Sequence, residues 1–131
     1  MKFFWIIALS LLSFGAFAQN GNPEEEEKQL RKAIDTQIDN YTNLLKLEDW
    51  QIFYLDSILT NDYTAMMAEL KGLSESKVSN QDAYIMVQDK WAEQIYNSLK
   101  SVFDETQWTK YEKSGAARDK KAREKRAAKR K

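Results

Sequence analysis

Apolar side chains recur every three or four residues along three long stretches of this chain, and this spacing limits its fold more than any other feature. A helix turns by about 100° per residue, so side chains at this spacing gather on one face. The three sets are Leu30, Ile34, Ile38, Tyr41 and Leu45; Ile52, Leu55, Leu59, Tyr63, Met66 and Leu70; and Tyr84, Trp91, Ile95, Leu99 and Val102. We therefore predict an all-α fold with helices over about residues 23–46, 48–71 and 80–102.

Local signals mark the ends of these helices. Asn22-Pro23 and the four glutamates that follow are typical of a helix start, because Asn caps free N–H groups and acidic side chains complement the helix dipole. Gly72 is a candidate C-cap of the second helix. Residues 74–80 are polar and predict a short turn, and Ser79 with Asp82 resembles a capping box. A short turn between two helices predicts an antiparallel helical hairpin.

The N-terminal segment resembles an export signal. Lys2 supplies a positive charge, residues 3–14 are almost entirely apolar, and Ala16-Phe17-Ala18 has the small residues of a cleavage site. A membrane-spanning helix needs roughly 20 apolar residues, so an uncleaved anchor is the weaker alternative. We predict a signal peptide over residues 1–18, a helical domain over residues 19–113, and a mature protein in the periplasm or secreted.

The amino-acid composition excludes the commonest kinds of catalytic and metal site. The chain has no cysteine and no histidine. Thiolate chemistry and sites with thiolate or imidazole metal ligands are therefore excluded. Acidic residues cluster at 24–27 and 48–49, but both clusters lie at predicted helix starts, where the helix dipole explains them. We predict no enzymatic activity, no catalytic residue, no cofactor and no metal site.

Charge is divided unevenly along the chain. Residues 19–109 contain 17 acidic and 8 basic residues, which gives −9, whereas residues 110–131 contain 3 acidic and 11 basic residues, which gives +8. Residues 114–131 have no large apolar side chain, so we expect a frayed helix or a disordered basic tail. The tail is a candidate for binding anionic membranes or polymers or the acidic body, unless it is simply solvated. Its candidate anion-binding residues are Arg118, Lys120, Lys121, Arg123, Lys125, Arg126, Lys129, Arg130 and Lys131.

A short element occurs twice, as Leu47-Glu48-Asp49-Trp50-Gln51 and as Phe103-Asp104-Glu105-Thr106-Gln107. In each copy an apolar residue precedes an acidic residue, and Gln follows three positions later. This pattern predicts a capping box, in which the acidic side chain and the Gln side chain each bind a backbone N–H of the first turn. Asp104 should therefore begin a fourth helix. The shared positions are Leu47, Glu48, Gln51, Phe103, Asp104 and Gln107.

The paired element resembles the LTxxQ motif of the Spy/CpxP family of small periplasmic proteins. Residues 107–113 resemble the end of that family's second motif, and the resemblance covers roughly residues 24–113. Glu48 and Asp104 stand where the family prefers Thr. The resemblance implies a cradle-shaped antiparallel dimer that holds unfolded proteins without ATP or modulates an envelope-stress sensor. Zinc binding linked to the family is not expected, because His and Cys are absent.

Apolar residues outside the three helical faces predict an interaction surface. They are Trp50, Phe53, Tyr54, Ile58 and Met67 in the second helix, and Ile85, Tyr96 and Phe103 in and after the third. A thin hairpin cannot bury both flanks, and exposed apolar area of this size is typical of an interface. The alternative to a client-binding surface is burial against the first and fourth helices or in a dimer. We expect a homodimer that binds unfolded or partner proteins; the alternatives are a regulatory or structural protein of the envelope and a tail-driven binder of anions.

Overall fold

The computed structural model describes residues 22–130, and the predicted signal peptide and Lys131 lie outside them. Its helices are α3 (Pro23–Leu45), α4 (Asp49–Glu75), α5 (Gln81–Leu99), α6 (Glu105–Tyr111), the π-helical turn η1 (Glu112–Ala116) and α7 (Ala117–Lys129). Residues 22–130 contain no strand. The prediction of an all-α fold of about four helices is confirmed.

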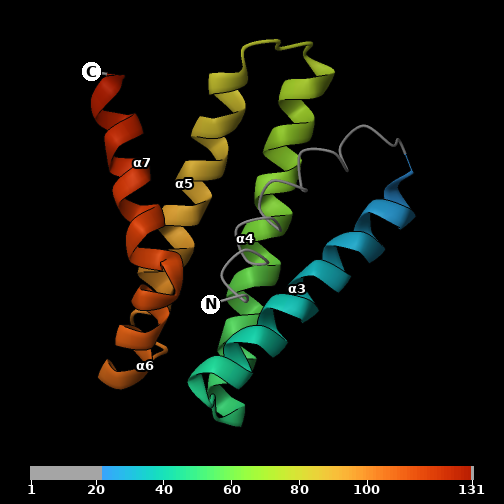
Figure 1. Cartoon of the computed structure of the whole chain (residues 1–131). Coiled ribbons are helices and arrows are strands. Elements are labelled where there is room, and N and C mark those ends of the chain that lie inside the picture. The colour runs from blue at the N-terminus through green and yellow to red at the C-terminus, as the bar shows by residue number, and fades with distance from the viewer. Residues whose placement is uncertain (1–21, 131) are drawn as a thin grey trace.

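Four helices lie next to one another in the order α7, α5, α4 and α3 (Figure 1). The helices α4 and α5 run antiparallel and form the predicted central hairpin, and α3 crosses α4 at an angle. After α5 the chain turns at one end of the hairpin into the short helix α6, and α7 then returns along the outer side of α5 (Figure 1). The end of α3 and the start of α4 therefore lie at the same end of the molecule as α6.

The start of α3 follows from its first residues. The Asn22 side chain accepts a hydrogen bond from the backbone N–H of Glu24, Pro23 occupies the first helical position, and acidic residues fill the first turn. The missing N–H of proline costs nothing there, because the first N–H groups of a helix have no partner within the helix. At its other end α3 stops at Lys46, whose left-handed backbone conformation (φ 54°) ends the helix.

Three predicted helix ends are wrong by a few residues. Gly72 lies inside α4, which continues to Glu75, because neighbouring helix formers outweigh the cost of one glycine. The N-cap of α5 is Asn80 rather than Ser79, since the Asn80 side chain accepts the N–H of Asp82 at 3.0 Å. The helix α5 ends at Leu99, three residues early, where the chain turns toward α6.

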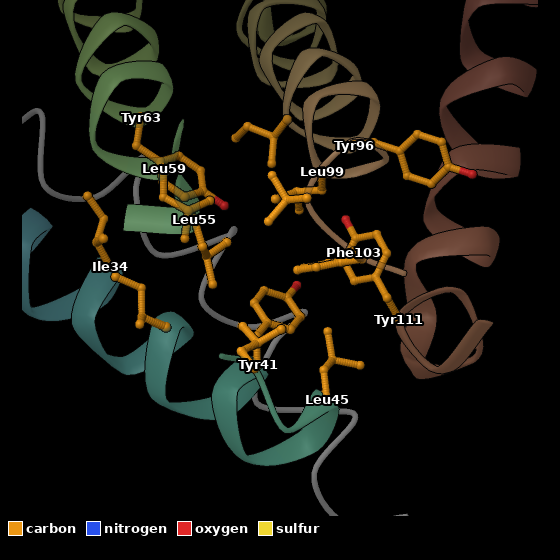
Figure 2. Close-up of a cluster of buried hydrophobic side chains, with 14 of the residues drawn as sticks. Ile34, Tyr41, Leu45, Leu55, Leu59, Tyr63, Tyr96, Leu99, Phe103 and Tyr111 are labelled. Atoms are coloured by element: carbon orange, nitrogen blue, oxygen red, sulfur yellow. The ribbon is translucent and has the colours of Figure 1, made fainter. Parts of the chain in front are cut away.

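The core joins the helical hairpin to α3 and to the C-terminal helices. Ile34, Leu55, Leu59, Met66 and Leu99 are its most completely buried side chains. Figure 2 shows side chains from α3, α4, α5 and the C-terminal helices converging between the ribbons. The apolar faces that the sequence predicted for the three long helices therefore pack against one another.

The basic segment is helical rather than disordered. The helix α7 extends over Ala117–Lys129, so of the two expected forms, a frayed helix and a disordered tail, the structure has a helix. It joins α6 through η1, where Gly115 has φ 130°, a conformation that side-chain-bearing residues rarely adopt. This glycine redirects the chain so that α7 lies beside α5. Side-chain contacts between helices, which a sequence pattern of alanine and charge does not reveal, hold α7 there.

Candidate functional site

The two copies of the repeated element meet in the folded chain, although 56 residues separate their glutamines. Nε2 of Gln51 donates to Oε1 of Gln107 at 2.6 Å, and Nε2 of Gln107 donates back to Oε1 of Gln51 at 3.1 Å. Both side chains are buried, with exposed fractions of 3% and 8%. The sequence predicted each glutamine as a local cap and gave no sign that they bind each other.

The remaining hydrogen bonds of each glutamine bind the backbone at the starts of α4 and α6 and in the segments that precede these helices. The contact of the two glutamines with each other and with this backbone is here called the junction. Oε1 of Gln51 accepts the backbone N–H of Glu48 at 2.9 Å, and Oε1 of Gln107 accepts that of Asp104 at 3.0 Å. Nε2 of Gln51 also donates to the Val102 carbonyl, and Nε2 of Gln107 donates to the Leu45 carbonyl. Each amide therefore makes four hydrogen bonds, which is its full capacity.

The predicted capping boxes are present at both helix starts. Asp104 accepts the N–H of Gln107 at 2.8 Å, which confirms that it begins α6, and Glu48 forms a box with Gln51. Leu47 and Phe103, which precede the acidic caps, are both buried in the core. The six shared positions thus fix the starts of α4 and α6 against each other.

A group of exposed rings lies next to this junction, on the first turns of α4. Trp50, Phe53 and Tyr54, here called the aromatic patch, have exposed fractions of 50%, 67% and 52%. The Tyr54 ring lies 6.2 Å from Trp50 and 5.6 Å from Phe53, in edge-on contacts. Nε1 of Trp50 donates to a Glu48 carboxylate oxygen at 2.7 Å. The patch is therefore one surface whose polar edge is held by the same acidic residue that caps the helix.

The other predicted surface residues divide into exposed and buried groups. Ile85 is exposed, together with its neighbour Met86, which sequence reasoning missed. Ile58 and Met67 are half-buried and pack against the core. Tyr96 and Phe103 are buried, with exposed fractions of 4% and 6%, so they do not belong to the exposed surface, and the alternative of burial against the fourth helix applies to both.

The C-terminal helices bury these last two rings. Tyr96 points from α5 toward α7 (Figure 2) and lies 4.9 Å from Trp108, while Phe103 lies 5.5 Å from Tyr111. Nζ of Lys120 lies 4.8 Å above the Tyr96 ring, a favourable cation–π position. The flank at Tyr96 and Phe103, which the sequence indicated as a candidate surface, is thus covered by α6, η1 and α7.

Ion pairs join α7 to α5 along most of its length. Lys120 and Arg123 both contact Glu93, at 2.6 Å and 3.0 Å. Farther along, Arg126 pairs with Asp89 at 2.8 Å and Arg130 with Asp82 at 2.7 Å. The expected attraction between basic tail and acidic body is therefore made within the chain by these four cations.

These pairs shift the pKa values of the carboxylates on α5. Burial by itself would raise the pKa of Glu93, but hydrogen bonds from Lys120 and Arg123 outweigh burial and hold the pKa below its usual value. The hydrogen bond from Arg130, aided by its charge, lowers the pKa of Asp82. Both shifts favour the charged form of the carboxylate and therefore the contact with α7.

Hollows among the described residues lie beside η1 and between α3 and α4. A small cavity of about 60 Å³ lies beside η1 and is lined by several tyrosines, including Tyr41 and Tyr63. A wider hollow of about 390 Å³ opens between α3 and α4, with Leu30, Arg31 and Thr64 among its lining residues. Known small-molecule sites measure roughly 300–1,000 Å³ and carry converging polar groups, so the first hollow is of a size for water.

Residues 22–130 contain no group of three or more His, Cys, Asp or Glu side chains placed to hold a metal ion. None of the helices in this part of the chain is long and apolar enough to cross a membrane. No family model, curated protein or solved structure matches the chain. Within the described residues, the aromatic patch is an exposed apolar surface and the outer face of α7 is an exposed basic one.

Proposed function

We propose that this chain is an exported, ATP-independent module that holds unfolded or partner proteins by binding their apolar segments to the aromatic patch. The observation that carries the proposal is the exposure of three neighbouring rings at one helix end. Aromatic side chains are enriched at protein interfaces, because they offer a large contact area for few rotatable bonds. The resemblance to the Spy/CpxP family, carried by the two motifs, agrees with this proposal.

The position of the patch suits binding. Its rings lie on the first two turns of α4, and the buried pair Gln51 and Gln107 fixes the start of that helix. A partner therefore does not have to order the backbone on which the rings stand, which lowers the entropy cost of binding.

The charge around the patch indicates which segments it would prefer. The exposed acidic residues Glu48 and Asp49 lie next to Trp50. Apolar segments flanked by Lys or Arg should bind better than segments flanked by Asp or Glu, since charge complementarity raises the association rate and excludes wrong partners. In this proposal the protein acts in the periplasm or after secretion, as a homodimer, and needs no cofactor.

An aggregation assay tests the proposal directly. A chemically denatured client is diluted into buffer with the protein, with and without ATP, and light scattering is followed. We expect protection that does not depend on ATP. The double variant Phe53→Ser/Tyr54→Ser should lose most of it, because these side chains point away from the core and their replacement removes the binding area without unfolding α4.

The matched control is Ile85→Ser/Met86→Ser, which removes exposed apolar side chains of similar size from the start of α5. Protection per chain by this control should equal that of the unchanged protein, because each aromatic patch lies within one chain and binds a client whether or not two chains associate. Absence of protection by the unchanged protein would favour the regulatory or structural role in the envelope. Equal losses in both variants would show that any exposed apolar side chain suffices, and the aromatic patch would not be the site.

A further inference from the structure

The helix α7 has two opposite basic faces. The inner face carries Lys120, Arg123, Arg126 and Arg130, which pair with acidic residues of α5. The outer face carries the remaining cations at intervals of three or four residues; they are Arg118, Lys121, Lys125 and Lys129, here called the basic row. At 100° and 1.5 Å per residue, the row occupies about 80° of the helix circumference and extends over about 16 Å.

The basic row is left to solvent. All four side chains are exposed. In the part of the chain that the structure describes, no carboxylate pairs with Lys121, Lys125 or Lys129, and Arg118 has only a long contact of 3.9 Å to Asp119. The acidic Glu124 turns instead toward Lys120, at 3.6 Å. Of the eight basic residues from Arg118 to Arg130, the C-cap of α7, four therefore remain available to an outside anion, whereas the other four attach the helix to the body.

We propose that the basic row rests on an anionic lipid surface. A straight row of cations on one side of a helix matches a plane of negative headgroups along its whole length. The apolar neighbours of the row, Ala122 and Ala128, are small, so the contact would be electrostatic and would not insert apolar side chains. Each Lys or Arg near such a surface strengthens binding about fivefold, which makes four cations on one face sufficient for weak, reversible attachment.

The architecture favours a membrane over a nucleic acid. The helix α7 lies at one edge of the molecule, with α5 between it and α4 (Figure 1). A membrane plane that touches the outer face of α7 lies on the side away from the acidic body. Because the potential of a charged surface is screened within roughly 8 Å at physiological salt, the headgroups would repel that body only weakly. A flexible polyanion would extend past α7 and meet that body. No aromatic residue follows Tyr111 to stack on a base.

The test is vesicle co-sedimentation of the protein purified from an exporting host, with its N-terminus determined by mass spectrometry. Vesicles of phosphatidylcholine with about one-third phosphatidylglycerol are compared with pure phosphatidylcholine, which measures any binding that does not depend on charge. The variant Lys121→Gln/Lys125→Gln/Lys129→Gln keeps helix propensity. After subtraction of binding to pure phosphatidylcholine, the binding of this variant to anionic vesicles should be on the order of 100-fold weaker than that of the unchanged protein. The unchanged protein should lose this binding as salt rises.

The matched control is Lys32→Gln/Lys71→Gln/Lys110→Gln, which removes the same net charge from exposed positions on three other helices. It should bind anionic vesicles nearly as well as the unchanged protein. Equal losses in the two variants would show that net charge alone drives binding and would overturn the proposal. Tight, row-dependent binding to single-stranded nucleic acid without binding to vesicles would also overturn it.

Discussion

The amides of Gln51 and Gln107 connect two helix starts through one buried contact. A buried polar group that loses its partner costs more than an intact hydrogen bond contributes, because the orphaned group has also lost water. Here each amide binds the other, a backbone N–H at its own cap and a carbonyl from the opposite connection. A change at either glutamine therefore leaves unpaired groups at both ends of the junction.

Gln51→Ala should lower the free energy of unfolding by about 2–3 kcal/mol, because it strands several buried donors and acceptors. Gln107→Ala should cost a similar amount. The double variant should cost less than the sum, by on the order of 1 kcal/mol, since both changes remove the same contact. Urea unfolding followed by circular dichroism measures all three values. The exposed Gln81→Ala is the control and should change stability by less than about 0.5 kcal/mol. Strict additivity would contradict a shared contact.

The helix α7 has no large apolar side chain, so its position depends on charge. Its inner cations reach carboxylates on α5 and cover the Tyr96 ring. Ion pairs that remain partly open to solvent contribute little each, and salt weakens them. The contact between α5 and α7 should therefore be the most salt- and acid-sensitive contact between helices in this molecule.

Glu93→Gln should lower stability at neutral pH by less than about 1 kcal/mol, because the Glu93 carboxylate is partly exposed. The pKa of Glu93 is lowered in the folded chain, so its contribution is complete above the unfolded value of 4.5 and disappears as pH falls through the folded value. The difference in unfolding free energy between variant and unchanged protein should thus approach zero in acid.

Chemical unfolding at a series of pH values tests this expectation. Asp39→Asn, which removes an exposed carboxylate without an ion pair in the described part of the chain, is the control and should show no such trend. A difference for Glu93→Gln that grows in acid would reverse the predicted sign and remove Glu93 from the contact with α7.

At the scale of the whole molecule, exposed large apolar side chains of residues 22–130 lie at both ends of the hairpin. The aromatic patch lies at the start of α4 and Leu44 near the end of α3, whereas Ile85 and Met86 lie at the start of α5. Because α4 and α5 are antiparallel, these places are at opposite ends of the hairpin (Figure 1). In the function that we propose, the aromatic patch holds a client while the surface at Ile85 and Met86 contacts a second copy of the chain.

We expect an elongated homodimer at micromolar concentration, measured by sedimentation velocity. Ile85→Ser/Met86→Ser should shift the protein toward monomer, because it removes the apolar area proposed to bury on association. Phe53→Ser/Tyr54→Ser should leave the dimer intact while client protection falls. A compact monomer for the unchanged protein across this range would refute the dimer, and loss of the dimer in the second variant would assign the aromatic patch to self-association.

Helix content, the hairpin and the start of α6 could be predicted from the sequence, because each depends on neighbouring residues. Apolar spacing fixes which side of a helix is buried, and a cap is a bond between residues three apart. The ends at Gly72 and Asn80 were less predictable, since several adjacent residues can cap a helix and small energy differences choose among them.

The all-α chain, the two capped helix starts and the separation of acidic body from basic end follow from the order of residues along the chain. The bond between Gln51 and Gln107, the burial of Tyr96 and the division of the α7 cations between α5 and solvent arise only once the helices have packed. The two groups of features differ in the range of the interactions that produce them. Periodicity and capping act over a few residues along the chain, whereas these outcomes depend on which helices become neighbours, and local spacing carries no information about that choice.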